Sequence, residues 1–228
     1  MDFPPFPGFR DAAFDLLRGL KQHNRRDWFQ PRKQVFKDEV EWPLQCLVVD
    51  AAREAQRRHL PLAGDPARSL FRIYRDIRFS RNKQPYKTHA GAVLSRSGER
   101  NDPGVVYIHV EPGASFLAAG FWRPPMALLR PWRLRITDDP AGFRQVLAAL
   151  EDRGLTLDPG TPLTRMPRGF EAYAGTEIAP LLQWTSFTVS RPVADEALRT
   201  PAFTQDVVRL AQDALPLLSY GWAILDRS

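Results

Sequence analysis

The middle of the chain, residues 71–122, places the strongest limit on the fold, because strand-like segments follow one another there with short connections. In residues 71–79 the side chains alternate between two faces, which is the two-residue period of a β-strand. Three further strand-like segments follow, at 90–95, 105–111 and 115–122. The pair Pro112-Gly113 between the last two predicts a hairpin turn. Neighbouring strands with short connections predict an antiparallel or mixed sheet and not a series of βαβ units.

Segments in which apolar residues recur at helical spacing lie on both sides of this block. On the N-terminal side they cover 9–20, a stretch that begins near Arg26, and 43–57. Asn24 is a candidate cap for the second of these helices. On the C-terminal side they cover 126–136, 140–150, 178–182, 195–199 and 203–218, and a further strand-like segment lies at 185–190.

No linker or change of composition divides the 228 residues, and 43% of them are hydrophobic, enough to form a sizeable core. A chain of this length is within the range of one domain. We therefore predict a single α+β domain over residues 1–228, with an antiparallel or mixed β-sheet flanked by N- and C-terminal helices. The sheet should contain roughly four to six strands.

The charge of the chain favours an anionic partner. Lysine and arginine number 32 against 26 acidic residues, a formal net charge of +6. Such an excess suits nucleic acid, a phosphorylated small molecule or a membrane surface, although many basic proteins bind no anion at all. The single cysteine, Cys46, excludes an internal disulfide and a zinc site built from cysteines.

The N-terminal residues lack the basic and apolar regions of a signal peptide, and no run approaches the roughly 18 apolar residues that span a bilayer. We therefore expect a soluble, cytoplasmic protein without a membrane partner. The chain also lacks glycine-rich phosphate loops and the HExxH, CxxC and GxSxG motifs. The sequence motifs therefore do not identify a reaction or a cofactor.

Four stretches resemble blocks of the DUF2461 family. They read FRIYRDIRFSRNKQPYKTHAG at 71–91, VYIHVEPGASFLAAGFWRP at 106–124, NRRDWFQPRKQVF at 24–36 and LTRMPRGFEAY at 163–173. The resemblance extends over nearly the whole chain, and the two central blocks are the most specific; the last departs from the family's tyrosine-and-acid pattern at Phe170-Glu171-Ala172. It implies one family domain of α+β character and supplies no catalytic assignment.

Residues 71–89, called the basic segment below, are the strongest candidate for a binding site. Arginine grips phosphate or carboxylate with a planar fork, whereas lysine acts as a mobile point charge. Asp76 is the only acid of the segment and should hold one arginine in position. The candidate ligand-binding residues are Arg72, Arg75, Asp76, Arg78, Arg81, Lys83, Tyr86, Lys87 and His89. A salt-bridged strand with a solvated loop is the structural alternative.

His109 and Glu111 are the candidate catalytic residues. They are two apart on a predicted strand and therefore share a face with Tyr107. An imidazole beside a carboxylate can act as a general base with its orienting group, or as two ligands of a metal ion. His89 would complete a three-ligand set if the strands pair suitably. We assign no metal ion from the sequence, because a histidine at a strand end is more often structural.

These residues support three hypotheses. In the first, a pocket lined by residues 72–89 and the strand 107–111 either binds a small phosphate- or carboxylate-bearing ligand or binds it and turns it over. In the second, the same basic residues contact the phosphates of a nucleic acid. In the third, the domain binds another protein. The sequence does not predict an oligomeric state.

Overall fold

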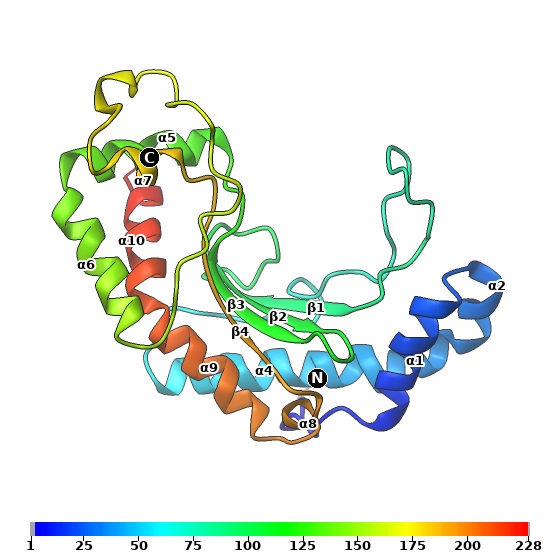
Figure 1. Ribbon diagram of the computed structural model, residues 1–228. Coiled ribbons are helices and arrows are strands. Elements are labelled where there is room, and N and C mark those ends of the chain that lie inside the picture. Colours follow the sequence, from blue (N-terminus) through cyan, green and yellow to red (C-terminus); the bar gives the residue numbers. More distant parts are fainter. Residues whose placement is uncertain (1–2, 228) are drawn as a thin grey trace. The chain divides into compact units, whose positions relative to one another are not determined.

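The computed structural model describes residues 3–227, which form two compact units (Figure 1). The first unit contains the described residues up to Asp102, together with Val106–Leu117 and Pro192–Arg209. The second contains Pro103–Val105, Ala118–Arg191 and the described residues from Leu210. The prediction of one domain therefore stays a prediction.

The sheet has four antiparallel strands in the order β1-β2-β3-β4. Their bounds are β1 Ala90–Leu94, β2 Val105–Val110, β3 Phe116–Phe121 and β4 Phe187–Pro192. These bounds agree with four of the predicted strand segments, and the α+β fold class is confirmed. In the first unit, β1 pairs with β2 so that Gly91 lies opposite His109 and Val93 opposite Tyr107.

The helices of the first unit begin with α1, whose buried face carries Phe14, Leu17 and Leu20. Helix α4, Trp42–Arg57, continues from the π-helical turn Lys37–Glu41 without a break, so Pro43 lies within a continuous helical segment, and α4 packs against β1. The helical elements of this unit are α1 Asp11–Gln22, α2 Arg26–Phe29, the 3₁₀ turn Gln30–Arg32, α3 Lys33–Phe36, the π-helical turn Lys37–Glu41, α4 Trp42–Arg57 and α8 Asp195–Leu198.

The second unit has its own aromatic core around Trp132. The indole stacks on Phe187 with ring centroids 4.1 Å apart and contacts the ring of Tyr220 at 5.6 Å. The helices of this unit are α5 Met126–Asp138, α6 Pro140–Glu151, the 3₁₀ turn Glu171–Tyr173, α7 Ala179–Gln183 and α10 Leu215–Leu225. Helix α9, Phe203–Asp213, has residues in both units. No helix within residues 3–227 has the length and apolar character needed to cross a membrane.

The predicted strand at 71–79 is wrong. Residues 69–75 run antiparallel to 85–93 as an irregular hairpin, held by isolated bridges such as Tyr74 with Tyr86. Its backbone bonds include Phe71 N–H to Gly91 O at 2.9 Å and Lys87 N–H to Ile73 O at 2.8 Å. Beyond this point the residues are mostly exposed and polar, so nothing packs against them to extend a strand. Residues 76–84 form a loop that projects from the sheet (Figure 1).

Asn24 anchors the base of this hairpin. Its side-chain Nδ2 donates to Tyr86 O and its Oδ1 accepts from Tyr86 N–H, both at 3.0 Å. The ring of Tyr86 is buried against Phe29, with centroids 4.3 Å apart. Asn24 is therefore not the predicted helix cap: Arg25 occupies that position, without a side-chain cap. The amide instead satisfies both backbone polar groups of one residue, Tyr86.

We predict that Asn24→Ala lowers the free energy of unfolding by about 1–3 kcal/mol, because it leaves a donor and an acceptor of Tyr86 unpaired in a partly buried place. Urea unfolding followed by circular dichroism measures the change. Asn82→Ala is the matched control, since Asn82 is exposed and bonds only to Gln84 within the loop. Equal stability of the two variants would contradict the anchoring role.

Candidate functional site

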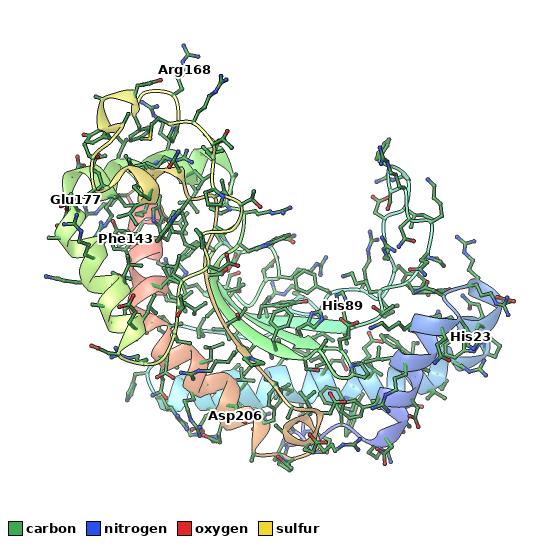
Figure 2. All side chains as sticks on the ribbon, in the orientation of Figure 1. His23, His89, Phe143, Arg168, Glu177 and Asp206 are labelled. Atoms are coloured by element: carbon green, nitrogen blue, oxygen red, sulfur yellow. The ribbon has the colours of Figure 1, made fainter. Side chains whose placement is uncertain are left out.

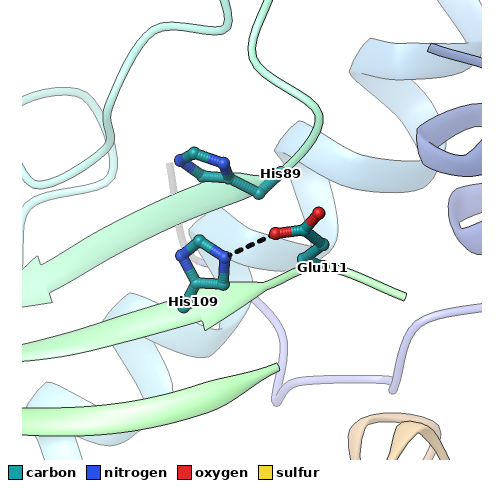
Figure 3. Close-up of side chains that lie close together, drawn as sticks. All are labelled: His89, His109 and Glu111. Carbon is teal, nitrogen blue, oxygen red and sulfur yellow. Dashed lines mark hydrogen bonds and ion pairs between the residues drawn. The ribbon is translucent and has the colours of Figure 1, made fainter. Parts of the chain in front are cut away.

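Three side chains on one face of β2 form a hydrogen-bonded chain. Tyr107 and His109 are two residues apart on β2 and therefore share a face, and Glu111 directly follows the last residue of the strand. The Tyr107 hydroxyl lies 3.0 Å from His109 Nδ1. On the other side of the ring, His109 Nε2 lies 3.2 Å from Glu111 Oε2, a contact drawn in Figure 3. Ser115 fixes the backbone of Glu111, since its hydroxyl accepts from Glu111 N–H and donates to Glu111 O. The strand period predicted this alignment.

His89 lies next to these side chains, just before the neighbouring strand β1. The register pairs Ala90 with Val110, so His89 just before β1 lies beside Glu111 just after β2. The rings of His89 and His109 lie 4.3 Å apart at an angle of 33°. Ligating atoms of His89, His109 and Glu111 all lie within 4.8 Å of one another (Figure 3). These three side chains are called the histidine cluster below.

Gly91 makes room for this arrangement. A Cβ atom at Gly91 would lie 2.8 Å from the Tyr107 hydroxyl oxygen and 3.1 Å from the Tyr107 ring. The Tyr107 side chain therefore lies across β1 where any other residue would displace it. The ring of Phe116 stacks on the imidazole of His109, with ring centroids 4.5 Å apart and an angle of 17° between the planes. The imidazole of His109 is thus held by packing as well as by hydrogen bonds.

Burial sets the charges of the cluster. It lowers the pKa of His89 to about 4, with further lowering by His109 and Lys87 and a smaller opposing effect of Glu111. Burial also lowers the pKa of His109, against the hydrogen bond that the imidazole makes to the Glu111 carboxylate and against the charge of that carboxylate. Both imidazoles are therefore neutral at neutral pH.

Tyr107 and Glu111 have opposite protonation states. Burial raises the pKa of Tyr107 to about 12, with help from the Glu111 charge, so the phenol stays protonated. Burial also acts to raise the pKa of Glu111, but hydrogen bonds with His109 and Lys21 outweigh it and leave this pKa below its usual value. Lys21 Nζ, at the end of α1, lies 3.4 Å from Glu111 Oε1. Glu111 is therefore a carboxylate that can accept a proton or bind a cation.

A cavity of about 700 Å³ lies in the same unit. Its basic side chains are Arg72, Lys87 and Arg100, and Glu41 is its acidic one. Burial lowers the pKa of Lys87, and the charges of Arg72 and Arg100 lower it further. The remaining wall is largely apolar and includes Phe36, Val40, Leu44, Leu70, Phe71 and Ile73. Within residues 3–227, neither Arg72 nor Lys87 forms a salt bridge.

Phe71 links the cavity to the histidine cluster. Its ring lines the cavity and meets the Tyr107 ring edge to face at 5.8 Å. Lys87 Nζ lies 5.1 Å from the centroid of the same ring. The cavity lining contains no residue of 107–111, so the pocket residues and the cluster are adjacent groups and do not form one wall.

The basic segment thus divides into two parts. Arg72 and Lys87 reach the cavity and His89 reaches the cluster. Arg78 instead holds Asp76 with two bonds of 3.0 and 2.7 Å, which with its backbone N–H lowers the pKa of Asp76 to about 2. The contact is of the kind expected from the sequence, in which Asp76 pairs with one arginine.

The other candidates lie outside the cavity lining. Lys83 Nζ donates to Ile77 O at 3.1 Å, and Arg81 is exposed in the loop. Arg75 is half-buried, and Tyr86 belongs to the core. Sequence reasoning missed Arg100 and Glu41, which reach the cavity from a polar turn and from the π-helical turn before α4. No local pattern distinguishes them from other surface charges.

The chain belongs to the DUF2461 family. The family model, described as a conserved hypothetical protein (DUF2461), matches residues 12–220 and so covers the basic segment, the cavity and the histidine cluster. A comparison with curated proteins and a comparison with solved structures each found no match. The family resemblance seen in the sequence is therefore confirmed, and the function has to be argued from the site.

We predict that Gly91→Ala and Tyr107→Phe are coupled. The added methyl group displaces Tyr107, so Gly91→Ala alone should cost about 1–3 kcal/mol of stability. Tyr107→Phe removes the oxygen nearest to the new methyl group, so the double variant should lose less than the sum of the single variants. Urea unfolding of all four proteins measures the coupling. Strict additivity would show that Gly91 and Tyr107 do not constrain each other.

Proposed function

We propose that the chain binds a small ligand carrying a phosphate or carboxylate group in the cavity of about 700 Å³. The observation that carries the proposal is the excess of positive charge there, with three basic side chains against one acidic. Burial lowers the pKa of Lys87, and the nearby charges of Arg72 and Arg100 lower it further, so the charged lysine is disfavoured there without a counterion. A bound anion would relieve this repulsion.

The shape and the wall of the cavity limit the ligand further. Its volume is in the range of pockets for small molecules, about 300–1,000 Å³, and is too small for a folded partner. Arg72 can offer its planar fork to two oxygens of one group, while Lys87 supplies a point charge. The apolar wall suits an uncharged body attached to the anionic group. We also propose that the protein acts in the cytoplasm.

If the protein also catalyses a reaction of the ligand, the hydrogen-bonded side chains Tyr107, His109 and Glu111 are the best source of acid–base chemistry. His109 is neutral and can take a proton, and the Glu111 carboxylate stabilises the imidazolium that results. Ligand binding does not depend on this acid–base role, because the cavity lining includes none of Tyr107, His109 and Glu111.

A thermal-shift screen tests binding. The probes are inorganic phosphate, sugar phosphates, nucleoside monophosphates and dicarboxylates. A ligand at 100 times its Kd should raise the Tm by roughly 5–10 °C. We expect Arg72→Ala and Lys87→Ala to abolish the shift. Arg81→Ala is the matched control, because it removes the same charge from the neighbouring loop, outside the cavity lining, and should keep the shift.

Nucleic-acid binding is the second candidate, and one observation favours it. Phe79 is 96% exposed at the projecting loop, close to Arg78, Arg81 and Lys83. An exposed aromatic ring among basic residues can stack on an unpaired base while the cations contact phosphates. This candidate predicts that Arg81→Ala weakens binding as much as Arg72→Ala, with a steep loss of affinity at high salt. If no probe and no nucleic acid binds, a protein partner is the remaining hypothesis.

A further inference from the structure

The histidine cluster has a second use, which does not require a ligand in the anion cavity. We propose that His89, His109 and Glu111 bind a divalent transition-metal ion of the zinc or iron(II) class. The three side chains come from two adjacent strand ends and lie close together, with the His89 ring over that of His109 (Figure 3). Their donor atoms are two imidazole nitrogens and one carboxylate oxygen, a set that occurs in catalytic zinc sites and in non-haem iron sites.

The spacing of the donor atoms fits such an ion. With ligand distances of about 2.1 Å, two donors of a tetrahedral metal lie about 3.4 Å apart. His109 Nε2 and Glu111 Oε2 are 3.2 Å apart, so a metal ion can replace the proton between them. One ligand atom from each of the three side chains lies within 4.8 Å of the other two. The remaining distance is closed by side-chain rotation of His89, whose ring already lies against that of His109.

The surroundings of His109 support the same conclusion independently. A metal-binding histidine nearly always makes a hydrogen bond through its second ring nitrogen, which fixes the ring and its tautomer. The Tyr107 hydroxyl makes this contact with His109 Nδ1 at 3.0 Å. The stacked ring of Phe116 fixes the imidazole plane from the side. His109 is 9% exposed, so its orientation is built into the sheet.

Two lysines limit the affinity of the site for a bare cation. Lys21 Nζ lies 3.4 Å from Glu111 Oε1, and the charge of Lys87 acts on His89. Three protein ligands leave at least one coordination position open, and an anion or hydroxide in that position would be attracted by both lysines. The site therefore suits a metal ion that carries an anionic ligand better than an aqueous cation.

Metal titration of the full chain, stripped with a chelator, tests the proposal. Zn²⁺ binding is measured by calorimetry, and Co²⁺ is added as a spectroscopic probe whose visible absorption reports coordination. We expect one ion per chain. His89→Ala, His109→Ala and Glu111→Gln should each weaken binding more than 10-fold and remove the Co²⁺ absorption. Tyr107→Phe should weaken it about 10–100-fold while leaving that absorption in place, as expected for a positioning residue.

His23→Ala is the matched control, because His23 is an exposed histidine at the end of α1, away from His89 (Figure 2). It should bind the metal like the unmodified chain, and so should Arg72→Ala, which separates this test from that of the anion cavity. If His109→Ala does not fold, Glu111→Gln carries the test, since it keeps the size of the side chain. Unchanged Zn²⁺ affinity in the cluster variants, or equal loss in His23→Ala, would overturn the proposal.

Discussion

The register of β1 against β2 is the constraint on which the site depends. It places Gly91 opposite His109 and thereby brings His89 beside Glu111. A shift by one residue would turn Tyr107 and His109 to the other face of the strand. The absence of a side chain at Gly91 is part of the same constraint, since Tyr107 occupies the space that a Cβ atom would need. Backbone pairing thus determines which polar groups meet.

The basic segment is held by different means at its two ends. Near the sheet, the Asn24 amide binds both polar groups of Tyr86, and the ring of Tyr86 lies in the core. Farther out, the loop depends on local bonds such as that between Arg78 and Asp76. Arg72 and Lys87 belong to the anchored part and reach the cavity. This difference explains why charges that look equivalent in the sequence have different surroundings.

The sequence predicted the elements whose cause is local, and it failed where distant segments meet. Apolar periodicity was sufficient for α1, α4 and the four strands of the sheet. The alternation in 71–79 suggested a strand, yet its outer half has no apolar neighbour to pack against, and Phe79 is exposed. Tyr107, His109 and Glu111 could be aligned from the strand period alone. The contact of His89 with His109 needed the register, and Arg100 at the cavity needed the tertiary fold.

Lys87 connects the two proposed binding sites. It lines the cavity with Arg72, contacts the ring of Phe71, and its charge lowers the pKa of His89. A bound anion would neutralise this lysine, and that would remove a repulsion felt by a cation at the histidine cluster. By linkage, a metal ion at the cluster would in turn strengthen anion binding, since the coupling between two sites is reciprocal. With the cavity empty, Lys87 repels a metal ion at the histidine cluster, and an anion in the cavity would remove that repulsion, so each ligand favours the binding of the other.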